Sequence, residues 1–447
     1  MKIILKSKIE IQSNSENEQQ IIDKFTFNNP KYQNAISFGR STRRIDKQIC
    51  LIEKSNNAAL HAPLGTLDYL VEMFNPEIID NRFESLVEIP FVGILRKYQE
   101  SFIDKAIDKK GGLMVAATGS GKTVSGLALA SRLKQRTLIL VKSKDLAEQW
   151  KEAIQRFNHC DSGLIGGGSN EEGQFFTVAL IQTMIKKDLS HFNYGLVICD
   201  EAHNIPSNQA YKVINGLNAK YKYGLSATPQ RRDNMEFMIT GAIGGVCSEI
   251  EQNQLEGKVL PVHVSAIEIP FNAQVDSWAE FINVLVDDEQ RNQVIVDRAV
   301  KSSEKMGTVV LCAQVRHCEL LGVMCNESGV NPLVLHGQLP AKTRAERMSK
   351  IQTAPLVIGT LSLLSEGIDV PNLSALIFAA PVSASIDRDN PAATRLIQSI
   401  GRIRRPFKSK SKSYVLDIID QCGFGVSAFD KRMVIYEKQG FGVTQNG

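Results

Sequence analysis

The strongest constraint on the fold comes from one short stretch, residues 116–123, which reads Ala-Ala-Thr-Gly-Ser-Gly-Lys-Thr. An apolar run at 112–115 predicts a buried strand before it, and residues 124–130 predict a helix after it. Glycines between a strand and a helix let backbone N–H groups surround an anion. Lys122 can then reach the β- and γ-phosphates of a nucleotide, and the Thr123 hydroxyl can hold Mg²⁺. The stretch predicts a phosphate-binding loop, with a glycine-rich structural turn as the alternative; Ala116 replaces the usual first glycine.

Strands and helices alternate along most of the remaining chain. In a first block, apolar runs predict strands at 137–141, 177–181, 196–199 and 223–225, with a helix at 144–156. In a second block, the predicted strands are 308–311, 333–335, 356–358, 375–378 and 414–416, and the predicted helices are 315–325, 341–351 and 392–402. This alternation predicts an α/β fold with parallel sheets, in which functional residues lie at the carboxyl ends of the strands.

The length of 447 residues predicts two or three domains. We expect a small N-terminal α+β accessory domain at 1–88, α/β domains at 89–250 and 251–425, a linker near 246–260, and a C-terminal tail at 426–447. The tail is expected to hold a helix at 427–436 and a frayed glycine-rich end. In the accessory domain we expect strands at 2–11, 25–27, 36–38 and 49–52, and a helix near 66–74.

Basic residues cluster in two places. Arg40, Arg43, Arg44 and Lys47 form one cluster in the accessory domain, and the run 404–412 forms another. Each cluster suits contact with a phosphate backbone, and a solvated loop explains each about equally well.

The composition narrows the setting in which the chain works. The net charge is only +4, so the overall charge does not by itself indicate nucleic-acid binding. Any surface that binds a nucleic acid must be a local basic patch. Eight cysteines include no Cys-x-x-Cys pair and no zinc-like spacing, which predicts reduced thiols in the cytoplasm. No run of 18 apolar residues exists, and the N-terminus is too briefly apolar for a signal peptide, so no membrane association is expected.

Two acidic residues follow the predicted strand at 196–199. Asp200 suits Mg²⁺, directly or through water, and Glu201 suits the role of a base or water-orienting group in phosphoryl transfer. An acidic boundary between a strand and a loop is the alternative, although the predicted phosphate loop on a neighbouring strand favours the functional interpretation.

Arginines near residue 400 could complete such a site. Cleavage of a γ-phosphate gathers negative charge in the transition state, which arginine stabilises. Arg402 and Arg405 are three residues apart, so a helix would place them on one face, while Arg404 would point elsewhere. Alone, these residues would be better explained as a basic helix end.

Four segments together carry a family resemblance. Ala-Thr-Gly-Ser-Gly-Lys-Thr at 117–123, Asp-Glu-Ala-His at 200–203, Ser-Ala-Thr at 226–228 and Gln-x-x-Gly-Arg-x-x-Arg at 398–405 resemble motifs I, II, III and VI of the superfamily 2 helicases of the DEAH type. Their order and spacing match over roughly residues 90–420. The alanine at 116 is usual in that superfamily, so it no longer speaks against the loop.

Further segments extend the resemblance. Residues 95–99 are similar to the segment in which a glutamine reads adenine, 141–150 to motif Ia, 181–184 to motif Ib, and 358–371 to motif V. The segment Gly-Leu-Ser-Ala-Thr-Pro-Gln-Arg-Arg-Asp at 224–233 resembles the XPB-like and phage UvsW-like branch, whose members act on DNA. XPB-like proteins carry an acidic residue where this chain has Arg232.

The resemblance implies two tandem RecA-like domains that clamp ATP, with Mg²⁺ as cofactor, and it assigns roles to individual residues. The implied catalytic residues are Lys122, Glu201, Arg402 and Arg405, and the implied metal-binding residues are Thr123 and Asp200. The implied nucleotide-binding residues are Arg96, Gln99, Thr118, Gly119, Ser120, Gly121, Lys122, Thr123, Gly367, Asp369 and Gln398. The implied coupling residues are His203, Ser226 and Thr228, and the implied nucleic-acid contacts are Lys142, Gln182, Thr183 and Thr360.

Two functions from different classes follow from this resemblance. The first is an ATP-dependent DNA helicase or translocase that unwinds or remodels forked, branched or single-stranded DNA in recombination, repair or replication. The second is an ATP-dependent remodelling subunit of a larger defence or restriction assembly that does not separate strands. An RNA helicase is a further alternative. The resemblance implies a bacterial, phage or mobile-element setting and leaves protein partners open.

Overall fold

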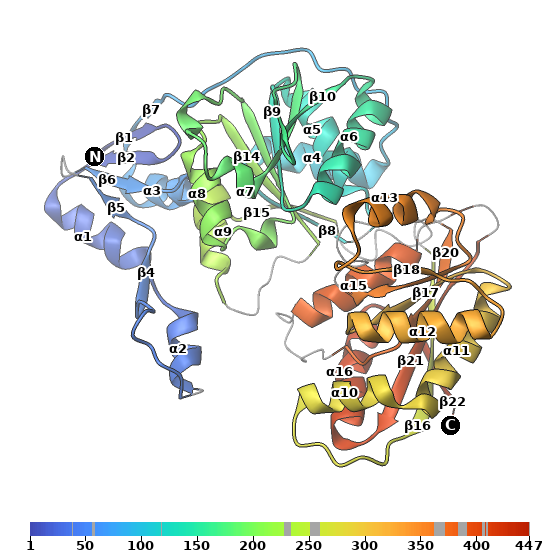
Figure 1. The fold of residues 1–447 in the computed structure, drawn as a ribbon. Helices are drawn as coiled ribbons and strands as arrows, with labels where there is room; N and C mark the ends of the chain where they lie inside the picture. Colours follow the sequence, from blue (N-terminus) through green and yellow to red (C-terminus); the bar gives the residue numbers. More distant parts are fainter. Residues whose placement is uncertain are drawn as a thin grey trace. The chain divides into compact units, whose positions relative to one another are not determined.

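The structure is a computed structural model that describes residues 1–37, 39–55, 59–117, 119–227, 234–250, 260–361, 372–382, 391–404, 407 and 410–446. The chain forms two compact units, Met1–Gln254 and Leu255–Gly447 (Figure 1). No described helix is both long enough and apolar enough to span a bilayer. All eight cysteines are free thiols.

An eight-stranded sheet forms the centre of unit 1, in the order β11-β10-β12-β9-β13-β14-β8-β15. Its strands are β8 (Gly112–Ala116), β9 (Thr137–Val141), β10 (Ser162–Gly166), β11 (Ser169–Glu171), β12 (Phe176–Leu180), β13 (Leu196–Asp200), β14 (Tyr221–Ser226) and β15 (Val246–Ile250). Every pairing is parallel except that of β10 with β11. The central strands are buried along almost their whole length because both faces of the sheet are covered.

Two groups of helices cover this sheet (Figure 1). One group is α4 (Lys97–Lys109), α5 (Lys122–Leu133) and α6 (Lys144–Asn158), and the other is α7 (Ile181–Met184), α8 (Asn208–Gly216) and α9 (Glu236–Ile243). A buried apolar cluster joins α7, α8 and α9 to β8, β9 and β13. The sheet is thus a middle layer that brings the carboxyl ends of its parallel strands to one edge.

The N-terminal residues of unit 1 form a second, smaller sheet in the order β5-β6-β2-β1-β7. Its strands are β1 (Lys2–Leu5), β2 (Ile9–Gln12), β5 (Glu53–Lys54), β6 (Leu60–Ala62) and β7 (Glu77–Asp80). The helices α1 (Ser15–Lys24) and α3 (Leu67–Phe74) pack against it, and η1 (Leu64–Thr66) contacts α9. The predicted single strand at 2–11 is in fact the hairpin β1–β2.

A separate pair of short strands, β3 (Thr26–Asn28) and β4 (Gln48–Cys50), flanks the helix α2 (Pro30–Ser37). The prediction of a strand at 36–38 is wrong for Ile36 and Ser37, which belong to α2; Phe38 lies outside the described residues. Pro30 at the first helical position, directly after Asn29, favours a helix start over a strand.

Unit 2 contains a seven-stranded parallel sheet in the order β18-β19-β17-β20-β21-β16-β22. Its strands are β16 (Val262–Pro270), β17 (Gly307–Cys312), β18 (Leu333–Leu335), β19 (Leu356–Thr360), β20 (Leu373–Phe378), β21 (Ser413–Gln421) and β22 (Gly442–Asn446). Its helices are α10 (Trp278–Asp287), α11 (Glu289–Ser303), α12 (Val315–Glu327), α13 (Ala341–Lys350), α15 (Pro391–Ile403) and α16 (Gly423–Lys438). Apolar clusters place α15 and α16 on one face of the sheet and α11 and α12 on the other.

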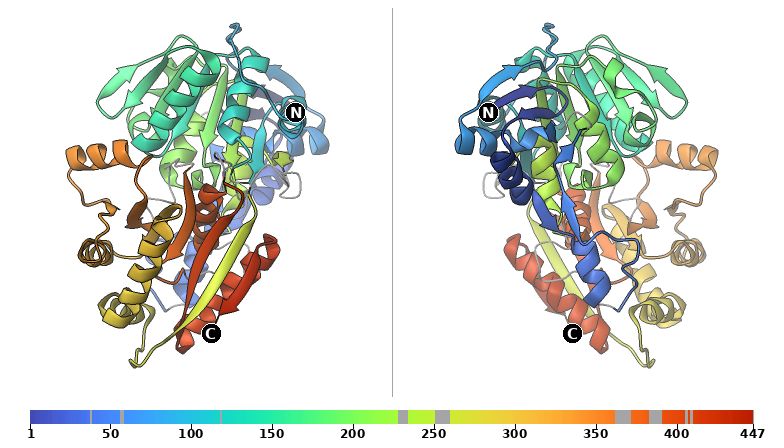
Figure 2. Two further views of the ribbon diagram at one scale, coloured as in Figure 1. Left: turned by 90° about the vertical axis from the view of Figure 1, so that its right-hand side faces the viewer. Right: turned by 90° about the vertical axis from the view of Figure 1, so that its left-hand side faces the viewer.

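Two boundary expectations need correction. Residues 426–447 are not a tail: α16 packs along β21 (Figure 2), and the glycine-rich end forms β22, which pairs with β16. The expected linker at 246–260 is wrong for 246–250, because those residues form β15 beside β8. Residues 251–259 lie outside the described part of the chain.

Two buried ion pairs hold the carboxyl end of β20 in unit 2. Arg291 of α11 is paired with Asp420 at 2.6 Å and also donates to the Ala379 carbonyl at 2.6 Å. Arg432 of α16 is paired with Asp417 at 2.8 Å and donates to the Val382 carbonyl at 3.2 Å. Breaking such a pair from one side leaves a buried charge uncompensated, which costs about 3–5 kcal/mol.

Candidate functional site

The loop between β8 and α5 has the backbone conformation that an anion-binding loop needs. Gly119 and Gly121 have positive φ angles of 88° and 87°, a region that favours glycine. A Cβ atom at Gly121 would also collide with the side-chain amide of Gln99. α5 begins at Lys122, so its free N–H groups and its helix dipole face the loop. This arrangement fits a phosphate group.

Polar groups of the same loop are in place for a ligand. The Lys122 ammonium donates to the Ala116 carbonyl at 3.1 Å, which keeps the side chain folded along the loop. The Ser120 hydroxyl is buried and has no hydrogen-bond partner among the described atoms, a condition that a bound phosphate oxygen would relieve. Thr123 lies half-buried in the first turn of α5, and Thr118 lies outside the described residues.

Gln99 connects the start of α4 to this loop. Its Oε1 accepts the backbone N–H of Arg96 at 2.9 Å, and its Nε2 donates to the Ser120 carbonyl at 3.0 Å. The Arg96 guanidinium donates to the Tyr98 hydroxyl at 2.9 Å, and that hydroxyl donates to the same Ser120 carbonyl at 3.3 Å. One lone pair and one N–H of the Gln99 amide remain, so Gln99 can hold the loop and still bind a nucleobase edge.

Asp200 ends β13 with both carboxylate oxygens held by the protein. One oxygen accepts the backbone N–H of Glu201, and the other accepts the indole N–H of Trp150, each at 2.9 Å. Burial and then the neighbouring Glu201 charge raise the pKa of the Asp200 carboxyl to about 6, whereas the Trp150 hydrogen bond and the Lys122 charge lower it. The carboxylate is ionised at neutral pH and keeps lone pairs free for Mg²⁺.

Glu201 has an unusual backbone that aims its side chain. Its φ of 49° lies in the left-handed region, which is uncommon outside glycine and typical of functional sites. The Glu201 carboxylate lies 3.3 Å from His203 Nδ1. The backbone carbonyl of Glu201 accepts the side-chain amide of Asn204 at 3.0 Å, at the start of η3 (Ala202–Asn204). Glu201 and His203 are therefore brought together beside Asp200.

β14 lies between β13 and β8, so the loop and the acidic pair are not on neighbouring strands as the sequence suggested. The register places Leu225 opposite Asp200 and Ser226 opposite Val115. Ser226 is fully buried at the end of β14. It therefore ends the strand that separates the phosphate loop from the acidic pair. Thr228 lies outside the described residues.

The predicted nucleic-acid contacts of unit 1 share one edge of the sheet. Lys142 directly follows β9, and Gln182 and Thr183 lie in α7 directly after β12. β9 and β12 are adjacent and parallel, so these residues leave the sheet at the same edge. Lys142 and Gln182 are exposed and Thr183 is half-buried. Thr360 ends β19 in unit 2 and is buried, so its described side chain presents little surface to a ligand.

The predicted arginines of unit 2 lie at the end of α15. Arg402 is half-buried in its last turn. Arg404 does not point to a ligand surface: its guanidinium donates to the Leu260 carbonyl at 3.1 Å and lies over the Phe441 ring. The backbone of Gln398 lies in α15, and nothing is described of its side chain. Gly367, Asp369 and Arg405 lie outside the described residues.

Comparison with known proteins agrees with this geometry. Residues 93–231 match a family described as type III restriction enzyme, res subunit, and residues 290–406 match the helicase conserved C-terminal domain. Probable helicase D10 of Escherichia phage T5 is 26% identical over 85% of this chain and 83% of its own length. DNA 3'-5' translocase XPB2 of Sulfurisphaera tokodaii is 32% identical over 41% of this chain and 42% of its own. ATP-dependent DNA helicase uvsW of Enterobacteria phage T4 is 22% identical over 73% of this chain and 68% of its own length.

Solved structures share the fold. A fragment of a putative HsdR subunit of a type I restriction enzyme from Vibrio vulnificus aligns with a TM-score of 0.60 at 18% identity, over 80% of this chain and 69% of that one. Dbp5 of S. cerevisiae, bound to RNA and ADP BeF3, aligns with a TM-score of 0.57 at 17% identity. The alignment covers 86% of this chain and 94% of the Dbp5 chain.

The chain belongs to the superfamily 2 helicases. Its relatives include XPB-like and UvsW-like proteins, and its two parallel-sheet units are the tandem RecA-like domains that the motifs implied. Its general function is that of an ATP-driven helicase.

One residue that contacts the candidate site was given no individual role in the sequence analysis. Trp150 was assigned only to a motif, yet its indole holds the Asp200 carboxylate. The buried positions of α6, namely Ala147, Trp150, Ile154 and Asn158, recur at helical spacing. That periodicity indicates which face of α6 is buried. It does not indicate that the indole N–H meets a carboxylate on another element.

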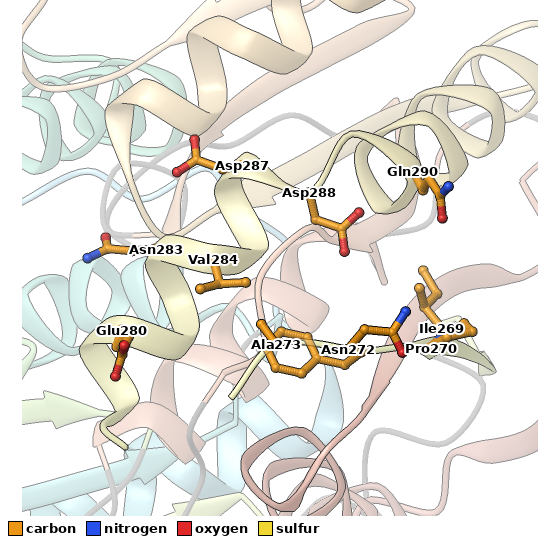
Figure 3. Close-up of a pocket in the computed structure, with 11 residues that line it drawn as sticks. Ile269, Pro270, Asn272, Ala273, Glu280, Asn283, Val284, Asp287, Asp288 and Gln290 are labelled. Carbon is orange, nitrogen blue, oxygen red and sulfur yellow. The ribbon is translucent and has the colours of Figure 1, made fainter. Parts of the chain in front are cut away.

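Unit 2 of the helicase also contains a cavity of about 620 Å³ between the end of β16 and the helices α10 and α11 (Figure 3). Its carboxylates already have local roles. Asp288 caps α11, Asp287 is paired with Arg316 at 2.6 Å, and Glu280 accepts the backbone N–H of Asp276 at 2.9 Å. None of the residues predicted for the ATP site lines this cavity.

Proposed function

We propose that this helicase is a DNA helicase or translocase that uses ATP to unwind or remodel branched DNA. The observation that carries the proposal is the meeting of the Lys122 loop with Asp200 and Glu201 at one edge of the unit 1 sheet. The names of the relatives support DNA: one is a DNA 3'-5' translocase and another is an ATP-dependent DNA helicase.

The residues around Asp200 fit a magnesium ion brought in with ATP. Mg²⁺ prefers oxygen ligands and is often held by one or two carboxylates together with substrate phosphates. Asp200 and the Thr123 hydroxyl would hold it, and the ion would supply positive charge to the phosphates. Burial raises the pKa of Asp200 to about 6, which is still below 7, so most of this carboxyl is ionised at pH 7.

The chain's own residues divide the remaining work. Lys122 neutralises the phosphates, and Glu201, oriented by its backbone and by His203, positions the attacking water and accepts its proton. Arg402 and Arg405 stabilise the charge of the transition state. Arg96, Gln99, Gly367, Asp369 and Gln398 bind the nucleotide, and Ser226 with Thr228 couples its turnover to movement on DNA.

Contact with DNA in this proposal is independent of sequence. Lys142, Gln182 and Thr183 leave the sheet at one edge and bind the sugar-phosphate backbone. Phosphate contacts release counterions, so the affinity should fall steeply with salt. Thr360 was predicted to join them, but its burial makes it the weakest member of the set.

One observation favours a second candidate function. In it, the chain is a remodelling subunit of a larger restriction or defence assembly and does not itself separate strands. Residues 93–231 match the family described as a restriction enzyme res subunit. The two candidates share ATP hydrolysis and differ in strand separation. ATP hydrolysis stimulated by DNA, without unwinding of any fork or four-way junction, would support the second candidate.

The test compares the purified chain with the variant Lys122→Ala. ATP hydrolysis and strand separation are measured on a DNA fork, a four-way DNA junction and an RNA fork of matched length. Because Lys122 carries the charge that faces the phosphates, we expect the variant to lose roughly 10²-fold or more of the hydrolysis rate.

Lys105→Ala, which removes an exposed lysine from α4, is the matched control and should behave as wild type. Hydrolysis by Lys122→Ala at the wild-type rate would refute the assignment of the site. Unwinding confined to the RNA fork would refute DNA as the substrate.

A further inference from the structure

A basic arm extends from unit 1, made of residues 29–47 and carrying α2 (Figure 1). It contains five basic residues and one acidic residue, and its net charge of +4 equals that of the whole chain. The rest of the chain is therefore balanced, and the excess positive charge is concentrated in the arm. The basic residues Lys31, Arg40, Arg43, Arg44 and Lys47 are all exposed.

Four of these cations are available for a partner. Within the described part of the chain, the side chains of Lys31, Arg43, Arg44 and Lys47 make no ion pair and no hydrogen bond. Exposed lysine and arginine side chains on a solvated loop are usually accompanied by acidic neighbours, whereas the only acidic residue here is Asp46. A charge excess of this density is expected to attract an anionic surface.

The arm is held in one shape by its own hydrogen bonds. The buried Asn29 side chain accepts the backbone N–H of Lys31 at 3.0 Å and donates to the Asp46 carbonyl at 2.7 Å. Its backbone N–H donates to the Lys47 carbonyl at 3.0 Å, so Asn29 joins both ends of the arm. A loop that is ordered before binding loses less entropy when a ligand arrives.

The base of the arm is attached to the helix that follows β14 in the sequence. Phe27 of β3 stacks on Phe237 of α9 with ring centroids 4.3 Å apart. Leu51, just after β4, is buried with Met235 and Met238 at the start of α9. The arm therefore moves with the domain that contains the phosphate loop rather than as a loose extension.

We propose that this arm is a second nucleic-acid contact of the helicase, and that it binds the phosphate backbone of double-stranded DNA. The inference rests on the proposed function, because a helicase that acts on branched DNA must hold a duplex region as well as a single strand.

The side chains of the arm favour the duplex over the single strand. Proteins that bind single strands add exposed aromatic rings on which the bases stack. Among the described residues of the arm the one aromatic side chain is Tyr32, and it is half-buried. The exposed groups are cations, which match the dense and regular charge of a duplex backbone.

The test is a salt titration of DNA binding by the full-length chain. The variant Arg43→Gln/Arg44→Gln/Lys47→Gln removes three of the four available cations and leaves the Asn29 hydrogen bonds and the β3–β4 pairing unchanged. Binding to a blunt DNA duplex and to a single strand of equal length is measured by fluorescence anisotropy between 50 and 200 mM salt. The slope of log K against log salt is negative, and each lost phosphate contact lowers its magnitude by about 0.9. We expect a decrease of about 2 to 3 for the duplex and little change for the single strand.

Two further variants show whether the change in slope comes from the arm itself or from a general loss of charge or of folding. Arg298→Gln/Lys301→Gln/Lys305→Gln removes the same charge from exposed positions at the end of α11 and just beyond it in unit 2, and it should keep the wild-type slope. Gln33→Lys/Asn34→Lys adds two exposed cations to α2 and should increase the magnitude of the salt slope for the duplex. This second variant reports on the arm even if the triple glutamine variant folds poorly.

Three outcomes would overturn the proposal. Equal slopes for the arm variant and the α11 control would make the arm a solvated loop. An equal decrease for the duplex and the single strand would remove the duplex preference. Loss of binding to anionic lipid vesicles, with DNA binding unchanged, would make a membrane the partner. Failure of the proposed function is separate: wild-type protein that binds duplex through the arm but hydrolyses no ATP with DNA would refute the function and leave the arm assignment standing.

Discussion

At the scale of single residues, the hydrogen bond between Trp150 and Asp200 connects the packing of α6 to the proposed Mg²⁺ site. A buried tryptophan needs a partner for its indole N–H, and Asp200 Oδ2 provides one at 2.9 Å. The bond holds the carboxylate in one orientation and lowers its pKa, against the effects of burial and of Glu201. Trp150 thus acts on the proposed Mg²⁺ site through Asp200 rather than by touching a ligand.

Replacing Trp150 by phenylalanine should change the pH profile of ATP hydrolysis. Without the donor, the pKa of Asp200 rises above its value of about 6, so a larger fraction of the carboxyl is protonated near neutral pH. We expect the acid limb of the profile to move to higher pH and the Mg²⁺ requirement at pH 6.5 to increase. The measurement is the rate of ATP hydrolysis from pH 5.5 to 8.5 at several Mg²⁺ concentrations.

Trp278→Phe, at the start of α10 in unit 2, is the matched control for this experiment and should leave the profile unchanged. If Trp150→Phe lowers the rate by the same factor at every pH, its role is packing alone and the positioning argument is wrong.

At the scale of elements, β14 carries a buried lysine, Lys222, with no acidic partner among the described residues. The Lys222 Nζ donates to the Ser7 carbonyl of the β1–β2 turn at 3.0 Å and to the Ile214 carbonyl of α8 at 2.7 Å. Burial, followed by the charges of Arg82 and Lys8, lowers the pKa of Lys222 to about 7. This lysine joins the N-terminal sheet to the central sheet of unit 1.

The stability of unit 1 should therefore rise with pH above neutrality. The pKa of Lys222 is about 7 in the folded state, against 10.5 for an ordinary lysine, so the unfolded chain binds more protons between these pH values. The free energy of unfolding should increase across that window by at most about 1.4 kcal/mol per pH unit. The measurement is the Tm of wild type and of Lys222→Met at pH 6.5 and pH 9.

The difference between wild type and Lys222→Met isolates this lysine from the other titrating groups. We expect the wild type to gain more Tm between the two pH values than the variant does. A parallel response of both proteins would show that Lys222 remains charged in the folded state and would contradict the argument.

At the scale of the whole molecule, the N-terminal residues are integrated into unit 1 rather than attached to it. The chain divides by contacts at Gln254, and not near residue 88. Gly65 packs so closely on α9 that a Cβ there would collide with the Thr240 carbonyl. The Phe27–Phe237 stack and the Leu51 cluster add apolar contacts to the same interface.

Deletion of residues 1–88 should destabilise the ATP-binding domain. It would expose the Met235, Met238 and Phe237 side chains of the α9 interface to water, at a cost of about 25 cal/mol per Å² of apolar surface. We expect a lower Tm and increased light scattering on heating. Phe27→Ala should show a smaller decrease in Tm, because it loses one ring contact and keeps the rest. An unchanged Tm in the deletion would show that the two sheets fold independently.

Much of the fold was predictable from the sequence because the local pattern of apolar residues and the burial of those residues in the tertiary structure agree. Runs such as 138–141 and 356–358 are apolar throughout, and such runs become strands only where both faces are covered. The Lys122 loop and the Asp200–Glu201 pair follow such runs, so the alternation of strands and helices already placed them at the carboxyl edge of a parallel sheet.

The errors occur where long-range contacts overrode local pattern. Residues 442–446 look like a frayed end, yet they pair with β16 because an open sheet edge offers unpaired backbone groups. Residues 246–250 look like a linker and instead add β15 beside β8. Arg404 begins a basic run that suits contact with a phosphate backbone, but the fold places its side chain against Leu260 and Phe441.

The sequence by itself predicted the chemistry of this helicase: which groups are proposed to hold phosphate, metal and water, and in what order they follow the strands. Such groups are specified by residue type and short spacing. Only the tertiary structure decided that Trp150 holds Asp200, that β14 separates the two halves of the unit 1 site, and that the basic arm is fixed to α9. Those facts depend on contacts between distant segments, and neither periodicity nor spacing along the chain records them.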